Sequence, residues 1–165
     1  MLQFVQNDLR LTIDSNADAA MTAPTTPRAW MAPIRRRYLD LFDELGISLD
    51  CAAPEQWRVQ PNEAQCLTLT RLAAEALTNI IKHSRARHAQ VALQLPETGE
   101  VILHIEDDGI GFDVESSRQT LGIGMRSMRA RLARLGGSLE VDSRPGQTVM
   151  TARLPASATS RHHPW

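Results

Sequence analysis

The sequence predicts an α/β two-layer sandwich, in which three helices cover one face of a mixed, mainly antiparallel sheet of about five strands. Short segments with alternating apolar residues predict the strands, and segments whose apolar residues recur every three or four positions predict the helices. A length of 165 residues suits one domain with a sizeable core and a short appendage.

The predicted domain occupies residues 28–155, and three other segments differ from it in composition. Residues 1–16 carry an apolar stripe and predict an amphipathic helix that needs a partner to be stable, and we expect it to project away from the sandwich. Residues 17–27 are small, rich in threonine and interrupted by two prolines, which is typical of a linker. Residues 156–165 show no periodicity and are expected to be a disordered tail.

The elements of the domain follow one another in the chain. They are a helix over about residues 28–45, strands over 47–52 and 57–60, a central helix from Pro61 to Ser84, strands over 89–95 and 100–107, a helix from about Met125 to Leu135, and a closing hairpin over 138–143 and 148–155. Asn62 can cap the central helix, and Glu63 places an acid in its first turn.

The composition narrows the possible functions. A formal net charge of −1 and a pI near 6.5 give no electrostatic case for nucleic acid as the main partner. No stretch approaches the roughly 18 apolar residues of a membrane span, and the first residues do not resemble a signal peptide. We therefore expect a cytoplasmic chain without direct membrane contact, in which Cys51 and Cys66 are reduced structural thiols.

The central helix carries an unusual polar face. At roughly 100° per residue, Glu75, Asn79 and Lys82 fall within about 60° of one another. A carboxylate and an amide oxygen one turn apart can share a hard cation such as Mg²⁺, and a lysine one turn further can meet the phosphates that accompany the cation. The alternative is a solvated face of a surface helix. The apolar residues on the opposite side are Leu69, Ala73, Ala76, Leu77 and Ile80.

A first glycine stretch follows the strand at 100–107. In D-x-G-x-G, Asp107 ends the strand and is followed by Gly109 and Gly111, which allow a sharp turn and the close approach of a flat ligand. A buried, ionised carboxylate there can accept a hydrogen bond from an exocyclic amine, such as that of adenine. The alternative is an ordinary turn after an edge strand.

A second glycine stretch, Gly122-Ile123-Gly124, leads into a helix. A helix N-terminus presents free N–H groups that suit phosphate. The stretch is neither a G-x-x-x-x-G-K-[ST] loop nor a glycine turn after the first strand of a dinucleotide fold. Taken alone, it is a weak signal that favours a plain junction between loop and helix.

The order and spacing of these three motifs resemble the catalytic ATP-binding domain of a sensor histidine kinase, a member of the GHKL superfamily. EALTNIIKHS resembles the N box, DDGIGFD the first glycine box, and GIGMRSMRARLARLGGSLEVDSRPGQTV the second glycine box with its hairpin. The resemblance is strongest to kinases related to nitrate and membrane-fluidity sensors, in which the segment between the glycine boxes is short. It implies the GHKL two-layer fold over residues 28–155, and it implies that residues 1–16 are a remnant of the second dimerisation helix.

For the metal and phosphates, the resemblance implies that Asn79 coordinates Mg²⁺ and that Glu75 orients a water or ligand around the ion. Lys82 would approach the phosphates, so that the three are the expected catalytic residues. His83 would assist Lys82, although a packed or capping histidine is the alternative. The glycines that would let the lid close on the triphosphate are Gly122 and Gly124.

For the purine, the resemblance implies that Asp107 binds the adenine amine and that Thr148 supports it through an ordered water. Gly109 and Gly111 would shape the pocket around the base. The family's usual G-T-x-V is here Gly146-Gln147-Thr148-Val149, so the identity of the residue that assists Asp107 stays open.

The implied function is donation of the γ-phosphoryl group of Mg²⁺–ATP to a histidine on a dimerisation helix, followed by relay to a response regulator. The phosphoacceptor of such kinases is a histidine followed by an acid, and none of the five histidines of this chain has that neighbour. The expected partners are therefore an acceptor helix elsewhere, a response regulator and a second copy that pairs through residues 1–16. A full-length parent kinase could be anchored in the inner membrane.

Two other functions fit the same motifs. The chain could be a stand-alone regulator that binds ATP and sequesters or serine-phosphorylates a partner, as anti-sigma-factor kinases of the superfamily do. It could also be a non-catalytic nucleotide sensor. The intact N box and glycine boxes argue against the sensor, and the segment NDLRLTIDS, which looks like the end of a dimerisation helix, favours the sensor kinase.

Overall fold

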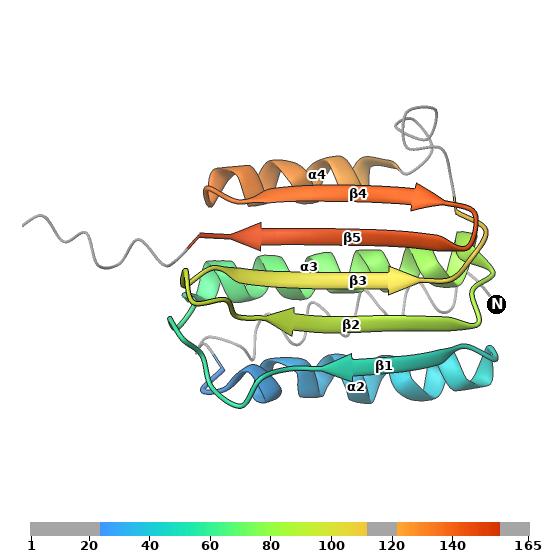
Figure 1. Ribbon diagram of the computed structural model, residues 1–165, viewed down its shortest axis with the longest axis horizontal. Coiled ribbons are helices and arrows are strands. Elements are labelled where there is room, and N and C mark those ends of the chain that lie inside the picture. Colours follow the sequence, from blue (N-terminus) through green and yellow to red (C-terminus); the bar gives the residue numbers. More distant parts are fainter. Residues whose placement is uncertain (1–23, 112–121, 156–165) are drawn as a thin grey trace, which may run out of the picture.

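The computed structural model describes residues 24–111 and 122–155 of the chain, which form one sheet covered by helices (Figure 1). The elements, in chain order, are α2 (Pro27–Glu44), β1 (Ser48–Ala52), α3 (Glu63–Asn79), the π-helical turn η1 (Ile80–Ser84), β2 (His88–Gln94), β3 (Val101–Asp107), α4 (Gly122–Arg134), β4 (Ser138–Arg144) and β5 (Gln147–Leu154). Predictions for residues 1–23 and 156–165 lie outside the described residues.

Within the described residues, the sheet has five strands in the order β1-β2-β3-β5-β4. β1 and β2 are parallel, and the other three pairs are antiparallel. Parallel neighbours need a long crossover, and here it contains α3 and η1. The predicted mixed, mainly antiparallel sheet is therefore confirmed.

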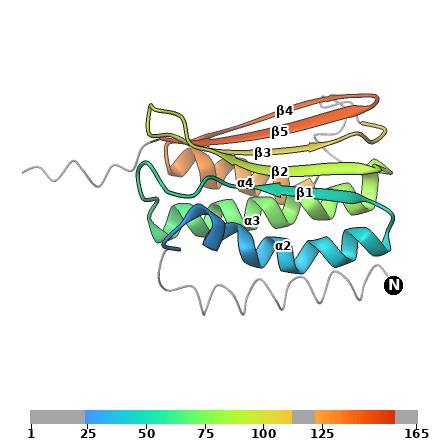
Figure 2. The ribbon, with the colours of Figure 1, turned by 60° about the horizontal axis from the view of Figure 1, so that its bottom comes forward.

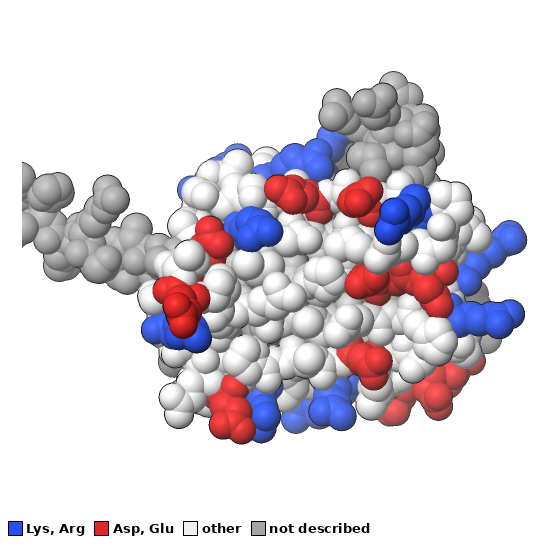
Figure 3. Space-filling view, in the orientation of Figure 1, with Lys and Arg blue, Asp and Glu red and all other residues white. Residues whose placement is uncertain are grey.

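The three α-helices α2, α3 and α4 lie on the same face of the sheet (Figures 1 and 2), as predicted. Each strand alternates between the two faces, so that Val91, Leu103 and Ile105 are buried beneath the helices. The other face is seen directly in Figure 3, where acidic side chains lie over the end of β3 and neutral residues fill much of the middle.

The helix boundaries have local causes. α3 begins with a capping box, in which the Asn62 side chain accepts the Gln65 N–H at 2.8 Å and the Gln65 side chain accepts the Asn62 N–H at 2.9 Å. The predicted cap is thus confirmed. α2 begins at Pro27, because the Thr26 side chain accepts the Ala29 N–H at 3.0 Å. The last residue of the expected linker therefore belongs to the helix.

The predicted strand over residues 57–60 is wrong. This segment has no ladder partner, and its side chains donate to carbonyl oxygens elsewhere. The Trp57 indole and the Gln60 amide both donate to Pro24 O, at 3.1 and 2.8 Å, and the Arg58 guanidinium donates to Leu95 O at 2.7 Å. These contacts hold the segment in an irregular path, so the short alternating pattern does not produce a strand.

α2 packs through one buried stripe at four-residue spacing, Trp30, Ile34, Tyr38 and Phe42. The indole N–H of Trp30 donates to Thr70 Oγ1 at 3.0 Å and lies 3.3 Å from Cys66 O, so the ring fixes α2 against α3. Burial raises the pKa of the Tyr38 hydroxyl to about 12 and that of the Cys66 thiol to about 11.

Candidate functional site

The polar face predicted on the central helix is present on α3. Glu75 and Asn79 are half-buried, one turn apart, while all five apolar residues predicted for the opposite side are buried. The helix therefore presents a carboxylate and an amide together, above a closely packed apolar side.

Asn79 carries a buried amide nitrogen that has no hydrogen-bond partner among the described residues. An unpaired buried donor costs about 1–3 kcal/mol, so such a group calls for a specific explanation. A ligand that supplies the missing acceptor is one such explanation. Within residues 24–111 and 122–155, no three His, Cys, Asp or Glu side chains gather to hold a metal ion. A cation at Glu75 and Asn79 would therefore need further ligands from a bound molecule or water.

The last turn of the predicted central helix is not α-helical. Residues Ile80–Ser84 form a π-helical turn, which ends where Arg85 takes a left-handed conformation with φ 53°. Lys82 and His83 are exposed on this wider turn. The regular α-helical spacing on which the prediction for Lys82 rests therefore ends before Lys82, and π turns often occur at functional sites. No pattern in the sequence predicts this turn.

Asp107 ends β3 and is buried on the helix side of the sheet, with 6% of its surface exposed. The strand register places it directly opposite Thr148 of β5, which is also buried, and the Thr148 hydroxyl lies 2.7 Å from that of Ser143. Burial raises the pKa of the Asp107 carboxyl, while the Gly109 N–H, donated to its Oδ1 at 2.9 Å, acts in the opposite direction. Asp107 and Thr148 are thus brought together as expected.

The D-x-G-x-G loop connects the helix end to the sheet end. The Ile110 N–H donates to Ser84 O at 2.7 Å, and a Cβ at Gly109 would overlap that same carbonyl. On its other side, Gly109 O accepts the Gly146 N–H at 2.8 Å, which joins the loop to the β4–β5 turn. Gly111 has φ +73°, and a Cβ there would overlap Arg144 O. Both glycines are required by close backbone packing.

Sequence reasoning missed the role of Asp108. Its Oδ1 accepts the N–H groups of His88 at 2.9 Å and of Arg87 at 2.8 Å, so it anchors the start of β2 to the end of β3. These bonds lower the pKa of the Asp108 carboxyl. Only the adjacent pair of aspartates in DDGIGFD signalled that one of them could have this structural role.

The second glycine stretch lies inside a helix. α4 begins at Gly122, so Gly122 and Gly124 belong to its first turn rather than preceding it. Glycine can adopt helical dihedrals as well as turn dihedrals, and the sequence pattern did not distinguish the two. Residues 112–121, which would form the predicted lid, lie outside the described residues.

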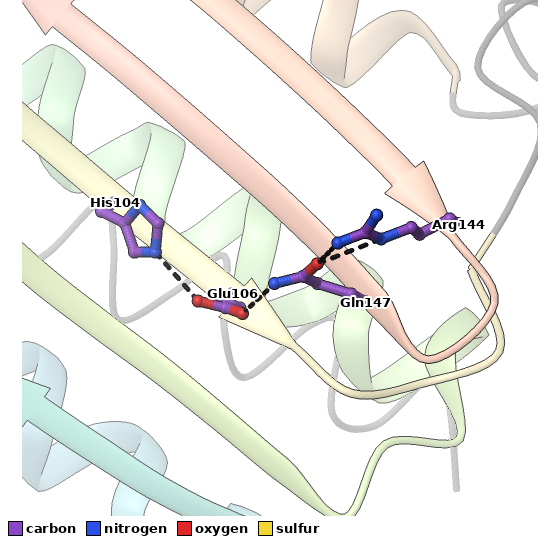
Figure 4. A network of polar contacts seen from close by, with 4 residues as sticks. All are labelled: His104, Glu106, Arg144 and Gln147. Carbon is purple, nitrogen blue, oxygen red and sulfur yellow. Dashed lines mark hydrogen bonds and ion pairs between the residues drawn. The ribbon is translucent and has the colours of Figure 1, made fainter.

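A hollow of about 540 Å³ opens at the same end of the sheet, on the face without helices. Figure 4 shows the polar network beside it. Gln147 Nε2 donates to Glu106 Oε1 at 2.7 Å, while His104 Nε2 lies 3.1 Å from Glu106 Oε2. The guanidinium of Arg144 donates through Nε to Gln147 Oε1 at 3.1 Å. The hydrogen bond from Gln147, and then that from His104, lower the pKa of the Glu106 carboxyl.

This outer hollow is not the predicted purine pocket. Its lining contains Asp107 and Gln147 but neither Thr148 nor Asn79. The register also separates the two candidates left open at the G-Q-T-V segment, because Thr148 is buried opposite Asp107 while Gln147 reaches Glu106 on the outer face. In the described ranges, moreover, no helix is both long and apolar enough to cross a membrane.

A mixed sheet with helices on one face, the polar face of α3 and the glycine loop packed against its end together define the class of α/β sandwich to which the chain belongs. Residues 65–158 match the family described as histidine kinase-, DNA gyrase B-, and HSP90-like ATPase, and the chain belongs to this family.

Related proteins include several sensor kinases. The chain is 39% identical over 103 residues to the signal transduction histidine-protein kinase/phosphatase UhpB of Salmonella typhimurium, covering 60% of this chain and 20% of that protein. It is 29% identical over 171 residues to the sensor histidine kinase MctS of Rhizobium johnstonii, covering 92% of this chain and 36% of that protein. The chain therefore spans about a third or less of these relatives' length.

A solved structure supports the fold. The histidine kinase domain of the blue-light activated histidine kinase EL346 from Erythrobacter litoralis matches with a TM-score of 0.68 at 21% identity, covering 90% of this chain and 71% of that chain. The predicted GHKL-type sandwich and the relation to sensor histidine kinases are thus confirmed.

Proposed function

We propose that this chain binds Mg²⁺–ATP and donates the γ-phosphoryl group to a histidine on a separate dimerisation helix, for relay to a response regulator. The observation that carries the proposal is the unpaired amide nitrogen of Asn79, a donor that a phosphate oxygen would satisfy, on a helix whose end packs against the D-x-G-x-G loop. Membership of the ATPase family and the sensor-kinase relatives support it.

The residues on α3 fit a magnesium ion. Mg²⁺ prefers oxygen ligands. It takes one or two of them from protein and the rest from phosphate and water. Glu75 and Asn79 supply such oxygens one turn apart, so an ion held there would take its remaining ligands from phosphate and water. Bound there, Mg²⁺ would neutralise phosphate charge. Asn79 would coordinate it directly, and Glu75 would orient a ligand around it.

The other residues have complementary roles. Asp107, ionised and buried, would accept a hydrogen bond from the adenine amine, with Thr148 beside it. Gly109 and Gly111 hold the loop that borders this carboxylate. Exposed Lys82, with His83 next to it, would meet the phosphates as the π turn ends. Gly122 and Gly124 lie in the first turn of α4, where free N–H groups suit an anion.

Phosphoryl transfer depends mainly on positioning and charge stabilisation. The chain's contribution would therefore be to hold the triphosphate in line with the incoming imidazole and to exclude water from it. The imidazole must be neutral to attack, and the acid that follows the acceptor histidine is the better-placed base, which leaves Glu75 to the ion.

The central test is Asn79→Ala in the full 165-residue chain. Calorimetry with a non-hydrolysable ATP analogue should give tight binding by the unchanged chain only when Mg²⁺ is present. The variant should lose the magnesium-dependent part, a fall in affinity of about 10- to 100-fold, because the amide ligand is gone. The matched control is Gln94→Ala, which removes an exposed amide from the outer face of β2. Equal Mg²⁺-dependent affinity in Asn79→Ala and wild type would contradict the assignment.

Phosphotransfer is tested by mixing the chain, labelled ATP and an acceptor-helix fragment from a sensor kinase of this family. Label on the fragment that is lost in acid but stable in base indicates phosphohistidine, as proposed. Acid-stable label would instead indicate a serine kinase and would reject the histidine assignment.

A further inference from the structure

Gln147 occupies a central place in the polar network on the outer face of the sheet (Figure 4). Its Oε1 accepts from the guanidinium of Arg144, and its Nε2 donates to the Glu106 carboxylate at 2.7 Å. Gln147 must offer an acceptor to Arg144, which only donates hydrogen bonds, and a donor to ionised Glu106, which only accepts them. A side-chain amide has one acceptor and one donor group at the right separation, and so a single orientation of Gln147 satisfies both.

The network spans the β4–β5 turn. Arg144 is the last residue of β4 and Gln147 the first of β5, so their side-chain bond closes the turn that contains Gly146. Glu106 ties the start of β5 to β3 on the outer face, and His104, two residues earlier on the same face, lies 3.1 Å from its other oxygen. The turn is thus fixed by side chains on the side away from the helices.

The same turn holds the glycine loop. The Gly146 N–H donates to Gly109 O at 2.8 Å, and the Arg144 carbonyl lies against Gly111 so closely that no Cβ fits there. Gly109 in turn donates its N–H to Asp107 Oδ1. Three hydrogen bonds and the peptide bond between Gly146 and Gln147 therefore connect Glu106 on the outer face, through Gly109, to the buried Asp107 carboxylate on the inner face.

We infer that Gln147 is a positioning residue for the purine end of the site, which acts by locking the β4–β5 turn against Gly109 and thereby orienting Asp107. The effect on nucleotide rests on the proposed function, whereas the effect on the turn does not. Within the described part of the chain, the hydrogen bonds of the four network side chains do not reach Glu75 or Asn79, so their loss should weaken nucleotide binding to the same degree with and without Mg²⁺.

Three isosteric variants test this inference. Gln147→Glu keeps the bond from Arg144 but sets a carboxylate against Glu106, so the turn should loosen. Glu106→Gln keeps an acceptor for Gln147, so the turn should stay closed, although the charge of the carboxylate is lost. The exchanged pair Gln147→Glu with Glu106→Gln restores a donor and an acceptor in reversed order, and the new carboxylate still receives Arg144. It should behave nearly as wild type.

The first readout is hydrogen exchange of the Gly146 amide in the nucleotide-free chain. Gln147→Glu should speed this exchange about tenfold, and the exchanged pair should restore the slow rate. The Gly99 amide, which donates to Pro96 O in the turn at the other end of the sheet, is the internal control and should not change. The second readout is ADP affinity without Mg²⁺, which should fall about tenfold in Gln147→Glu and recover in the pair.

The outcomes of these experiments distinguish the inference about Gln147 from the proposed function of the chain. Unchanged Gly146 exchange in Gln147→Glu, or a pair that exchanges as fast as the single variant, would overturn the inference. So would unchanged ADP affinity in Gln147→Glu while wild type binds ADP, since the turn would then not affect the purine end. A wild-type chain that binds no nucleotide would instead reject the proposed function, and the exchange data would still decide whether Gln147 locks the turn.

Discussion

Glu106 and Asp107 are neighbours in β3, and their carboxyl pKa values shift in opposite directions. Glu106 lies on the outer face, where hydrogen bonds from Gln147 and His104 favour the charged form and lower its pKa. Asp107 points to the helix side, where burial favours the neutral form and raises its pKa. Ionised Glu106 therefore contributes stability above its unfolded pKa, which is lost as the pH falls through the lower folded value.

The raised pKa of Asp107 has the opposite sign and predicts how binding depends on pH. The fold favours the neutral carboxyl, so ionisation costs stability as the pH rises through the folded pKa. The adenine amine needs the ionised form, so ADP affinity should decline in acid at a pH above the ordinary aspartate value of about 3.9.

Titration calorimetry with ADP from about pH 7 down to about pH 4 would measure the decline, with Asp107→Asn as the comparison. The variant should bind about 10- to 100-fold more weakly at neutral pH and show little of the acid dependence. If the ADP affinities of wild type and Asp107→Asn fall in parallel as the pH is lowered, a group other than Asp107 causes the decline.

The central helix combines regular α-helical turns with one π-helical turn at its end. α3 begins at a capping box and continues as regular α-helix to Asn79, after which η1 widens to a π turn. Within η1, the Ser84 hydroxyl donates to Ile80 O at 2.8 Å and accepts the Ala86 N–H at 3.0 Å, so its end is held by side-chain bonds. The helix is thus anchored at both ends, with the polar face of Glu75 and Asn79 between them.

The capping box should contribute measurably to stability. Asn62→Ala removes the acceptor of the Gln65 N–H and leaves that amide to water, so the free energy of unfolding should fall by about 1 kcal/mol. Urea denaturation would measure it, and Asn62→Ser, which keeps a capping oxygen, should lose much less. An alanine variant as stable as the serine variant would mean that the cap contributes nothing.

The cap and the π turn mark the limits of sequence reasoning for this element. The cap at Asn62 was predictable because capping depends on residues three positions apart. The apolar side of the helix was predictable because the helical period alone determines which residues share a face. No local pattern predicted the π turn, whose last residue, Ser84, accepts at its carbonyl oxygen the N–H of Ile110 from the distant D-x-G-x-G loop. Likewise, residues 57–60 are irregular because they bond to Pro24 and Leu95, which no local pattern reveals.

At the scale of the whole molecule, the candidate site joins segments that are distant in the chain. The polar face of α3, the end of β3 and the start of β5 meet at one end of the sandwich, linked through the glycine loop. The sequence predicted the layers and the mixed, mainly antiparallel sheet, and the family resemblance predicted that Thr148 lies near Asp107. The exact strand register that pairs these two residues, and turns Gln147 to the other face, could not be predicted, since register is set by long-range pairing.

A ligand that bridges these segments should stabilise the whole fold. At about 100 times its Kd, Mg²⁺ with the ATP analogue should add about 2.7 kcal/mol, which for a chain of this size raises Tm by roughly 5–10 °C. Differential scanning calorimetry would measure the shift, with Asn79→Ala as the control. A shift that is equally large in the variant would place the ligand away from α3.

Among the strands of residues 24–111 and 122–155, β5 comes last in chain order, yet it lies inside the sheet, between β3 and β4. A nascent polypeptide leaving the ribosome therefore exposes the open edge of β3 until the final strand emerges and inserts. Until then, Asp107 has no Thr148 opposite it in the sheet, and the Gly109 carbonyl oxygen has no Gly146 N–H to accept. An unfinished chain thus cannot hold nucleotide in the proposed way, and the ability to do so arises only when synthesis has passed Leu154.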